Sequence, residues 1–127
     1  MIDIHNLIYQ YPQADQPALQ IQKLHIPPGS FSLITGQSGA GKSTLLRLLN
    51  GLVPHFSGGT LSGEIQVAQH NPVIEGPQVM SRLVGFVFQE PENQFVVDVV
   101  EDEIAFSMEH AAVARDEMRQ RMHLILE

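Results

Sequence analysis

The stretch from Gly36 to Thr44, which reads GQSGAGKST, limits the possible fold of this chain more than any other. It matches the pattern G-x-x-x-x-G-K-[ST], in which a glycine-rich loop wraps a polyphosphate. Its glycines have no Cβ and tolerate positive φ, so the backbone can turn its N–H groups toward phosphate oxygens. Lys42 adds a positive charge near the β- and γ-phosphates, and Ser43 offers a hydroxyl ligand to Mg²⁺. A helix that begins here would point the positive end of its dipole at the anion.

The neighbouring sequence favours a strand, a loop and a helix in that order. Ser30–Thr35 is apolar without clean alternation, as in a strand buried on both faces, and Thr44–Leu52 places leucines on one helical face. We therefore predict that the chain binds a nucleoside triphosphate, or descends from a protein that did. The Thr44 hydroxyl could equally bond the helix backbone. The residues expected to hold the nucleotide are Gly36, Gln37, Ser38, Gly39, Ala40, Gly41, Lys42, Ser43 and Thr44.

The charge of the chain is unevenly distributed. The net charge of the 127 residues is −7 at pH 7, and all of it lies beyond Gln89, because acids and bases before that point are equal in number. This balance argues against a general nucleic-acid binder, which would show a basic stripe. No apolar run reaches about 18 residues, so we expect no direct membrane insertion. The absence of cysteine excludes a disulfide scaffold and thiolate metal sites. The N-terminus has no apolar segment of the kind found in a signal peptide, so a cytoplasmic protein is the simplest interpretation.

The apolar pattern predicts further elements on either side of the motif. Ile2–Tyr11 should form a strand with an irregularity near His5 and Asn6, where its apolar residues change phase. Asp98 and Glu101 are spaced as a capping box and predict the start of a helix. The other expected features are strands at Leu19–Ile26, Glu64–Val67 and Leu83–Phe88, a helix stop at Gly51, a loop at Ala68–Pro77, and a C-terminal helix carrying Met118, Met122, Ile125 and Leu126.

The order of these features resembles the first half of the ATP-binding cassette (ABC) ATPases, the motor subunits of ABC transporters. The likeness runs from Met1 to the end of the chain and includes SGGTLSGEI and VGFVFQEPENQ. It implies an α/β fold of the P-loop NTPase class and ABC-ATPase type, with an antiparallel β subdomain. Residues 1–97 would form the β and P-loop core portion, and residues 98–127 would begin the helical subdomain.

The resemblance also implies roles for single residues. In this family an aromatic residue at the first strand-turn stacks on adenine; Tyr11 matches that position, with Tyr9 as the second choice. Gln89 matches the glutamine that closes a core strand and contacts Mg²⁺ and the attacking water. Lys42 and Gln89 would then act in catalysis, and Ser43 and Gln89 would hold the metal. The implied cofactors are ATP and Mg²⁺.

Two stretches, GLVPHFSGGTLSGEI and FQEPENQFVVDVVEDEIAFSMEH, are similar to the energy-coupling-factor and cobalt-type importers. A parent protein of this kind would couple ATP hydrolysis to solute import at the cytoplasmic face of the cell membrane. Its partners would be a second ABC ATPase domain, arranged head to tail, and a transmembrane subunit bound through the groove near Gln89. Glu90 and Glu92 could form bidentate pairs with arginines of that subunit.

Several motifs of the family are missing from this sequence. It contains no LSGGQ-like signature, no apolar strand ending in Asp-Glu and no histidine in the place of the switch residue. We therefore expect an N-terminal part of a longer ATPase that binds nucleotide weakly or not at all and does not hydrolyse it alone, because the residue that would activate water is missing. One alternative is a nucleotide-binding or regulatory fragment without motor function. Another is a GTPase or small-molecule kinase, which the lack of an N-K-x-D guanine reader disfavours.

Overall fold

The computed structural model describes residues 1–126, and the last residue, Glu127, lies outside the described residues. The chain divides into two compact units, Met1–Phe86 and the residues from Val87 onward. In chain order the elements are β1 (Ile2–Gln10), β2 (Leu19–Ile26), α1 (Lys42–Leu49), α2 (Leu52–His55), β3 (Thr60–Val67), α3 (Pro72–Met80), the 3₁₀ helix η1 (Pro91–Gln94), α4 (Val100–His110) and α5 (Arg115–Leu126).

The sheet of the first unit has three antiparallel strands in the order β2–β1–β3. The register between β1 and β3 shifts between His5 and Ile8, so β1 contains a β-bulge where the sequence predicts an irregularity. Asn6 in the bulge has a φ of +48°. Gly63 of β3 lies against it, and a Cβ on Gly63 would come 2.3 Å from the Asn6 carbonyl oxygen. Glycine is therefore required opposite the bulge.

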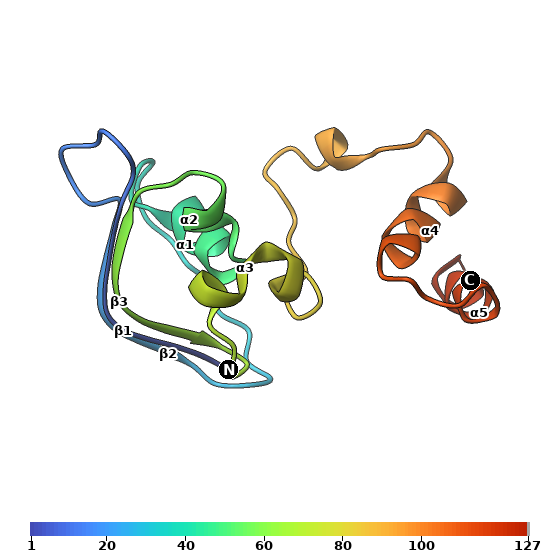
Figure 1. The fold of residues 1–127 in the computed structure, drawn as a ribbon, viewed down its shortest axis with the longest axis horizontal. Helices are drawn as coiled ribbons and strands as arrows, with labels where there is room; N and C mark the ends of the chain where they lie inside the picture. The colour runs from blue at the N-terminus through green and yellow to red at the C-terminus, as the bar shows by residue number, and fades with distance from the viewer. Residues whose placement is uncertain (127) are drawn as a thin grey trace. The chain divides into compact units, whose positions relative to one another are not determined.

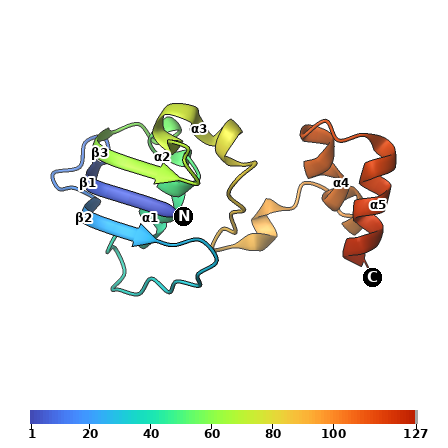
Figure 2. The same ribbon diagram turned by 90° about the horizontal axis from the view of Figure 1, so that it is seen from below.

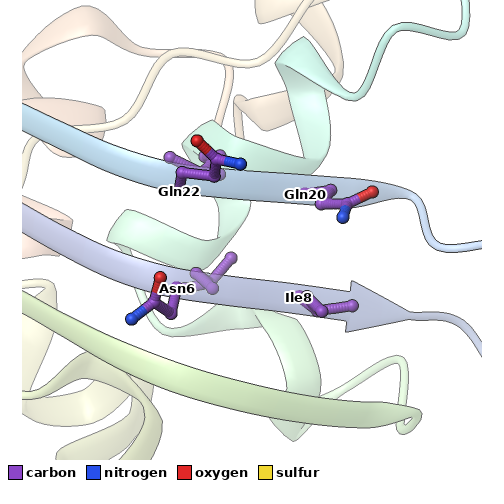
Figure 3. A pocket seen from close by; sticks show the side chains of 6 residues that line it. Asn6, Ile8, Gln20 and Gln22 are labelled. Carbon is purple, nitrogen blue, oxygen red and sulfur yellow. The ribbon is translucent and has the colours of Figure 1, made fainter.

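The edge strand β2 changes phase at the same level as β1. Leu19 and Ile21 turn inward before this point, and Leu24 and Ile26 turn inward after it. Because both strands change phase together, their mutual register stays constant along the whole ladder. On the face away from the helices the irregularity leaves a shallow hollow of about 120 Å³ (Figure 3). It is lined by Asn6, Leu7, Ile8, Gln20, Ile21 and Gln22.

Helices α1, α2 and α3 cover one face of this sheet, which is seen on edge in Figure 1 and from its open face in Figure 2. Side chains from both layers form one apolar core, because each strand turns alternate residues inward and α1 turns its leucine stripe toward them. Gly51 follows α1 with a φ of +72° and ends it, as the sequence predicts. The core residues are Ile4, Leu7, Tyr9, Leu19, Leu45, Leu48, Leu49, Val53, Ile65, Val67 and Met80.

Two predicted core strands do not form. Neither Ser30–Thr35 nor Leu83–Phe88 has strand structure, and Phe31 and Leu33 are 95% and 80% exposed. The physical reason is that a strand is stabilised by ladder hydrogen bonds and cross-strand contacts, and within residues 1–126 neither segment lies beside a pairing strand. Apolar, β-prone sequence alone therefore gave a wrong prediction for both segments.

Helix α3 occupies most of the segment that the sequence predicts to be a loop. Its N-cap is Asn71, whose side-chain oxygen accepts hydrogen bonds from the backbone N–H groups of Val73 and Ile74. Pro72 suits the first helical position, and the Glu75 carboxylate accepts a 3.0 Å bond from the Asn71 N–H. The strand before it, β3, also begins earlier than predicted, at Thr60 rather than Glu64.

The second unit consists of η1, α4 and α5. Helix α4 begins at Val100 after an N-cap at Val99 that has no side-chain hydrogen bond, so the predicted cap at Asp98 is wrong. Instead, the Glu103 carboxylate accepts bonds of 2.8 and 3.0 Å from the N–H groups of Val96 and Val97. This carboxylate ties the segment before α4 to the first turn of the helix. Among the residues that the structure describes, no helix is long and apolar enough to cross a membrane.

Candidate functional site

The phosphate-binding motif forms a turn that leads into α1 from the side of β2. Gly41 is the N-cap of α1 and has a φ of +83°. A Cβ at this position would lie 2.4 Å from the Ala18 carbonyl oxygen and 2.8 Å from a methyl carbon of Leu19. Only glycine therefore lets the start of α1 lie this close to the start of β2. Because Gly41 has no capping side chain, the first turn of α1 leaves backbone donors for an anion.

The Lys42 side chain bridges the end of the phosphate-binding loop to its start. Its Nζ donates hydrogen bonds of 2.8 Å to the Gly36 carbonyl oxygen and 2.6 Å to the Gln37 carbonyl oxygen. An ammonium group has three N–H donors, so these two bonds leave one donor and the positive charge for a phosphate oxygen. The ammonium group is thereby held beside the first two residues of the loop.

The two hydroxyl residues after Lys42 have different environments. Ser43 is exposed, whereas Thr44 is 8% exposed. The Thr44 Oγ1 lies 3.2 Å from the hydroxyl oxygen of Tyr11, close enough for a hydrogen bond. This bond is an alternative partner for the Thr44 hydroxyl besides the helix backbone. The Ser43 hydroxyl is therefore the accessible one of the two, and Thr44 is tied to the end of the first strand.

The two tyrosines at the end of β1 differ in accessibility. Tyr9 is 0% exposed and donates a 2.7 Å hydrogen bond to the Gly58 carbonyl oxygen, so its ring has no room to stack on a base. Burial raises the pKa of the Tyr9 phenol above its ordinary value. Tyr11 is half-buried and meets Tyr9 edge to face, with ring centroids 4.9 Å apart. Of the two aromatic residues considered for adenine, only Tyr11 remains a candidate.

A hollow of about 220 Å³ lies beside the motif in the first unit. It lies between the start of β2, the segment before the loop and the first turns of α1. Its wall is mostly apolar, and it includes the end of the loop and Lys42, the first residue of α1. The residues around it are Ala18, Leu19, Gln20, Ile21, Ile34, Thr35, Ala40, Gly41, Lys42 and Leu45.

Gln89 belongs to the second unit, whereas the phosphate-binding motif belongs to the first. Its side chain is exposed, as is that of Glu92. The expected roles of Gln89 in metal binding and catalysis, and of Glu90 and Glu92 in binding a partner, stay predictions. The structure brings together Tyr11 and residues 36–44, all of which lie in the first unit.

The residues of the loop fit a polyphosphate with a divalent cation. Lys42 provides a charged donor, the uncapped first turn of α1 provides backbone donors, and Ser43 provides an exposed oxygen. The motif could be read from the sequence, because its residues are contiguous. The link between Tyr11 and Thr44 could not, because it joins residues 33 positions apart. No local sequence signal predicts such a contact.

Comparison with known proteins gives a consistent result. The sequence model of the ABC transporter family matches residues 19–127. A protein of Methanosarcina acetivorans, provisionally named as an ABC transporter ATP-binding protein, is 43% identical over 96% of this chain and 19% of its own length. A similarly named protein of Streptomyces avermitilis is 40% identical over the whole chain and 23% of its own length.

A further relative has a more specific name. The energy-coupling factor transporter ATP-binding protein EcfA1 of Lactiplantibacillus plantarum is 40% identical over the whole chain and 44% of its own length. The chain thus spans about a fifth of the length of the first two relatives and less than half of the third.

Proposed function

Because the chain belongs to the ABC transporter family of ATP-binding proteins, we propose that residues 36–44 bind the phosphates of ATP together with Mg²⁺. The observation that carries the proposal is the position of Lys42, whose Nζ bonds two loop carbonyl oxygens and keeps one donor for a phosphate. The exposed Ser43 hydroxyl is the proposed metal ligand. The half-buried ring of Tyr11 is the proposed platform for adenine.

When bound, ATP supplies a phosphoanhydride whose hydrolysis can drive transport, and Mg²⁺ offsets its negative charge. The part proposed for this chain is positioning. Lys42 and the first turn of α1 would orient the phosphates, and Ser43 would orient the metal ion. Gln89 is proposed to contact the metal ion and the attacking water. The sequence has no acidic pair after an apolar strand, so we propose that this chain alone binds nucleotide weakly and does not hydrolyse it.

The finer proposal is a role in solute import of the energy-coupling-factor type. It is supported by the similarity to EcfA1 of Lactiplantibacillus plantarum, which covers all of this chain. In that role the chain would act at the cytoplasmic membrane face with a second ATPase domain and a transmembrane subunit. The exposed carboxylate of Glu92, in the acidic part of the chain, suits an arginine-bearing partner. A nucleotide-holding fragment without motor function is the alternative.

The test of nucleotide binding is a thermal unfolding measurement with and without Mg-ATP. A ligand at 100 times its dissociation constant adds about 2.7 kcal/mol, which raises the melting temperature of a domain of this size by on the order of 10 °C. We expect this shift in the unchanged chain and its loss in Lys42→Ala. Lys23→Ala is the matched control, because Lys23 is an exposed lysine on β2. An equal shift in the unchanged chain and Lys42→Ala would contradict binding at this loop.

A further inference from the structure

The Tyr11 side chain is held at both ends. At one end its hydroxyl lies 3.2 Å from Thr44 Oγ1, in the first turn of α1. At the other end its ring meets Tyr9 edge to face, at an interplanar angle of 78°. Tyr9 is itself fixed by complete burial and by its 2.7 Å bond to the Gly58 carbonyl oxygen. Tyr11 therefore connects a rigid part of the core to the helix that follows the phosphate-binding loop.

The first turn of α1 has two other side-chain anchors, the Lys42 bonds to the loop and the buried Leu45, but it has no side-chain cap. Its N-cap, Gly41, makes no side-chain hydrogen bond, and Ser43 is exposed. The backbone of Gly41 lies against Ala18 at the start of β2, so the end of β1 and the start of β2 hold the same turn from two sides. A helix start without a side-chain cap frays readily. The bond between Tyr11 and Thr44 opposes that fraying from outside the helix.

We propose that the Tyr11 hydroxyl positions the phosphate-binding loop, by fixing Thr44 and with it the turn that carries Lys42 and Ser43. This inference rests on the proposed function of the loop. It gives Tyr11 a role that does not depend on the base of the nucleotide. A residue that only stacks on adenine would affect the base and leave the phosphates alone. A positioning residue affects any ligand that binds through its phosphates.

Tripolyphosphate with Mg²⁺ separates these two roles, because it has the phosphates of ATP but no base. Tyr11→Phe keeps the ring and removes the hydroxyl. We expect this variant to bind tripolyphosphate and ATP more weakly by the same factor, roughly two- to tenfold for one hydrogen bond. Tyr11→Leu also removes the ring, so it should lose further affinity for ATP but not for tripolyphosphate. Titration calorimetry well below the melting temperature measures both affinities.

Tyr9→Phe is the matched control. It removes the hydroxyl of a neighbouring tyrosine whose bond goes to Gly58, away from the loop, so it should lower thermal stability without changing the tripolyphosphate affinity. A second control tests the partner. In a Thr44→Val background, Tyr11→Phe should cause no further loss of affinity, because the bond is already gone.

Three results would overturn the inference. The first is that Tyr11→Phe binds tripolyphosphate as tightly as the chain without substitutions, when that chain binds it well. The second is an equal loss in Tyr9→Phe, and the third is full additivity of Tyr11→Phe with Thr44→Val. If the unchanged chain binds neither tripolyphosphate nor ATP, the proposed function itself fails, and the positioning role fails with it. The two failures are therefore distinguishable.

Discussion

The three-stranded sheet and the segment Ser30–Thr35 are both rich in apolar residues that favour β structure, but only the sheet buries them. Leu7 in β1 is 0% exposed, whereas Leu33 is 80% exposed. β1 has a hydrogen-bonded strand on each side and helices over one face. Ser30–Thr35 has no such neighbour within residues 1–126. β-propensity thus becomes stable structure only where a paired and covered position exists.

This difference divides the candidate phosphate-binding site into two halves. The half after the loop is α1, which buries Leu45 and Leu48 in the core and contacts the end of β1 through Thr44. The half before the loop is the exposed segment Ser30–Thr35. Lys42 joins the two halves, because its ammonium group belongs to α1 and its acceptors are the carbonyl oxygens of Gly36 and Gln37. The geometry of the site is therefore determined mainly from the helix side.

The largest expected effect comes from making the same substitution in both regions. Leu7→Ala should lower the free energy of unfolding by about 2–5 kcal/mol, because it removes buried methyl groups and leaves a cavity. Leu33→Ala should change it by less than about 0.5 kcal/mol, because its side chain already lies in solvent. Urea unfolding followed by circular dichroism measures both values.

Similar costs for the two leucine variants would break this comparison. Such a result would mean that Ser30–Thr35 packs against the rest of the protein in solution. The structure does not predict such packing, because the Phe31 side chain is 95% exposed. A Phe31→Ser variant would then test whether Phe31 and Leu33 share one covered face. If they do, this variant should also lower the free energy of unfolding.

Much of the sheet could be predicted from the sequence, because its signals are local. The irregularity near Asn6 follows from the order of apolar residues, and the β-bulge confirms it. The cap of α3 is also a local signal, Asn71 and Pro72 followed by Glu75, although the sequence analysis predicts a loop there. The unpaired state of Ser30–Thr35 could not be predicted, because pairing depends on strands distant in sequence.

The candidate site shows the same limit. The contiguous motif predicts the residues of the loop and the start of α1 near Lys42, and the family match supports the P-loop class. The contact of Tyr11 with Thr44 and the close approach of Gly41 to Ala18 depend on how β1 and β2 lie against α1. These are tertiary contacts between separate elements. Composition and periodicity contain no information about them.

A pair of glycines separates contact from backbone conformation within the first unit. Gly63 and Gly29 both have positive φ, +93° and +70°, but a Cβ on Gly63 would lie 2.6 Å from the Leu7 Cα, and one on Gly29 would meet nothing within 4 Å. Gly29→Ala should cost about 1 kcal/mol from φ alone. Gly63→Ala should cost about 2–4 kcal/mol in the free energy of unfolding, because a steric clash is added. Equal costs would show that the bulge relaxes around the new methyl group.

The smallest expected effect concerns the pH dependence of the free energy of unfolding, to which Glu75 in α3 contributes. The Glu75 carboxylate accepts a 2.7 Å bond from His70 Nδ1 and one of 3.0 Å from the Asn71 N–H, and the His70 bond is the main reason that the pKa of Glu75 is lowered from its ordinary 4.5. A folded-state pKa below the unfolded value adds stability that is complete above the unfolded pKa. That stability is lost as the pH falls through the lower folded value.

Glu75→Gln tests this pH dependence, because it removes the charge and keeps the shape. We expect the unchanged chain to be more stable than Glu75→Gln at neutral pH, and the difference in the free energy of unfolding to shrink once the pH falls below about 4.5. The effect should be small, because solvent screens an accessible pair. Ser30–Thr35 contains no ionisable side chain, so Leu33→Ala should follow the pH profile of the unchanged chain. A difference between the unchanged chain and Glu75→Gln that stays constant from neutral to acidic pH would mean that Glu75 acts through the second acceptor oxygen, which the glutamine amide lacks, and not through its charge.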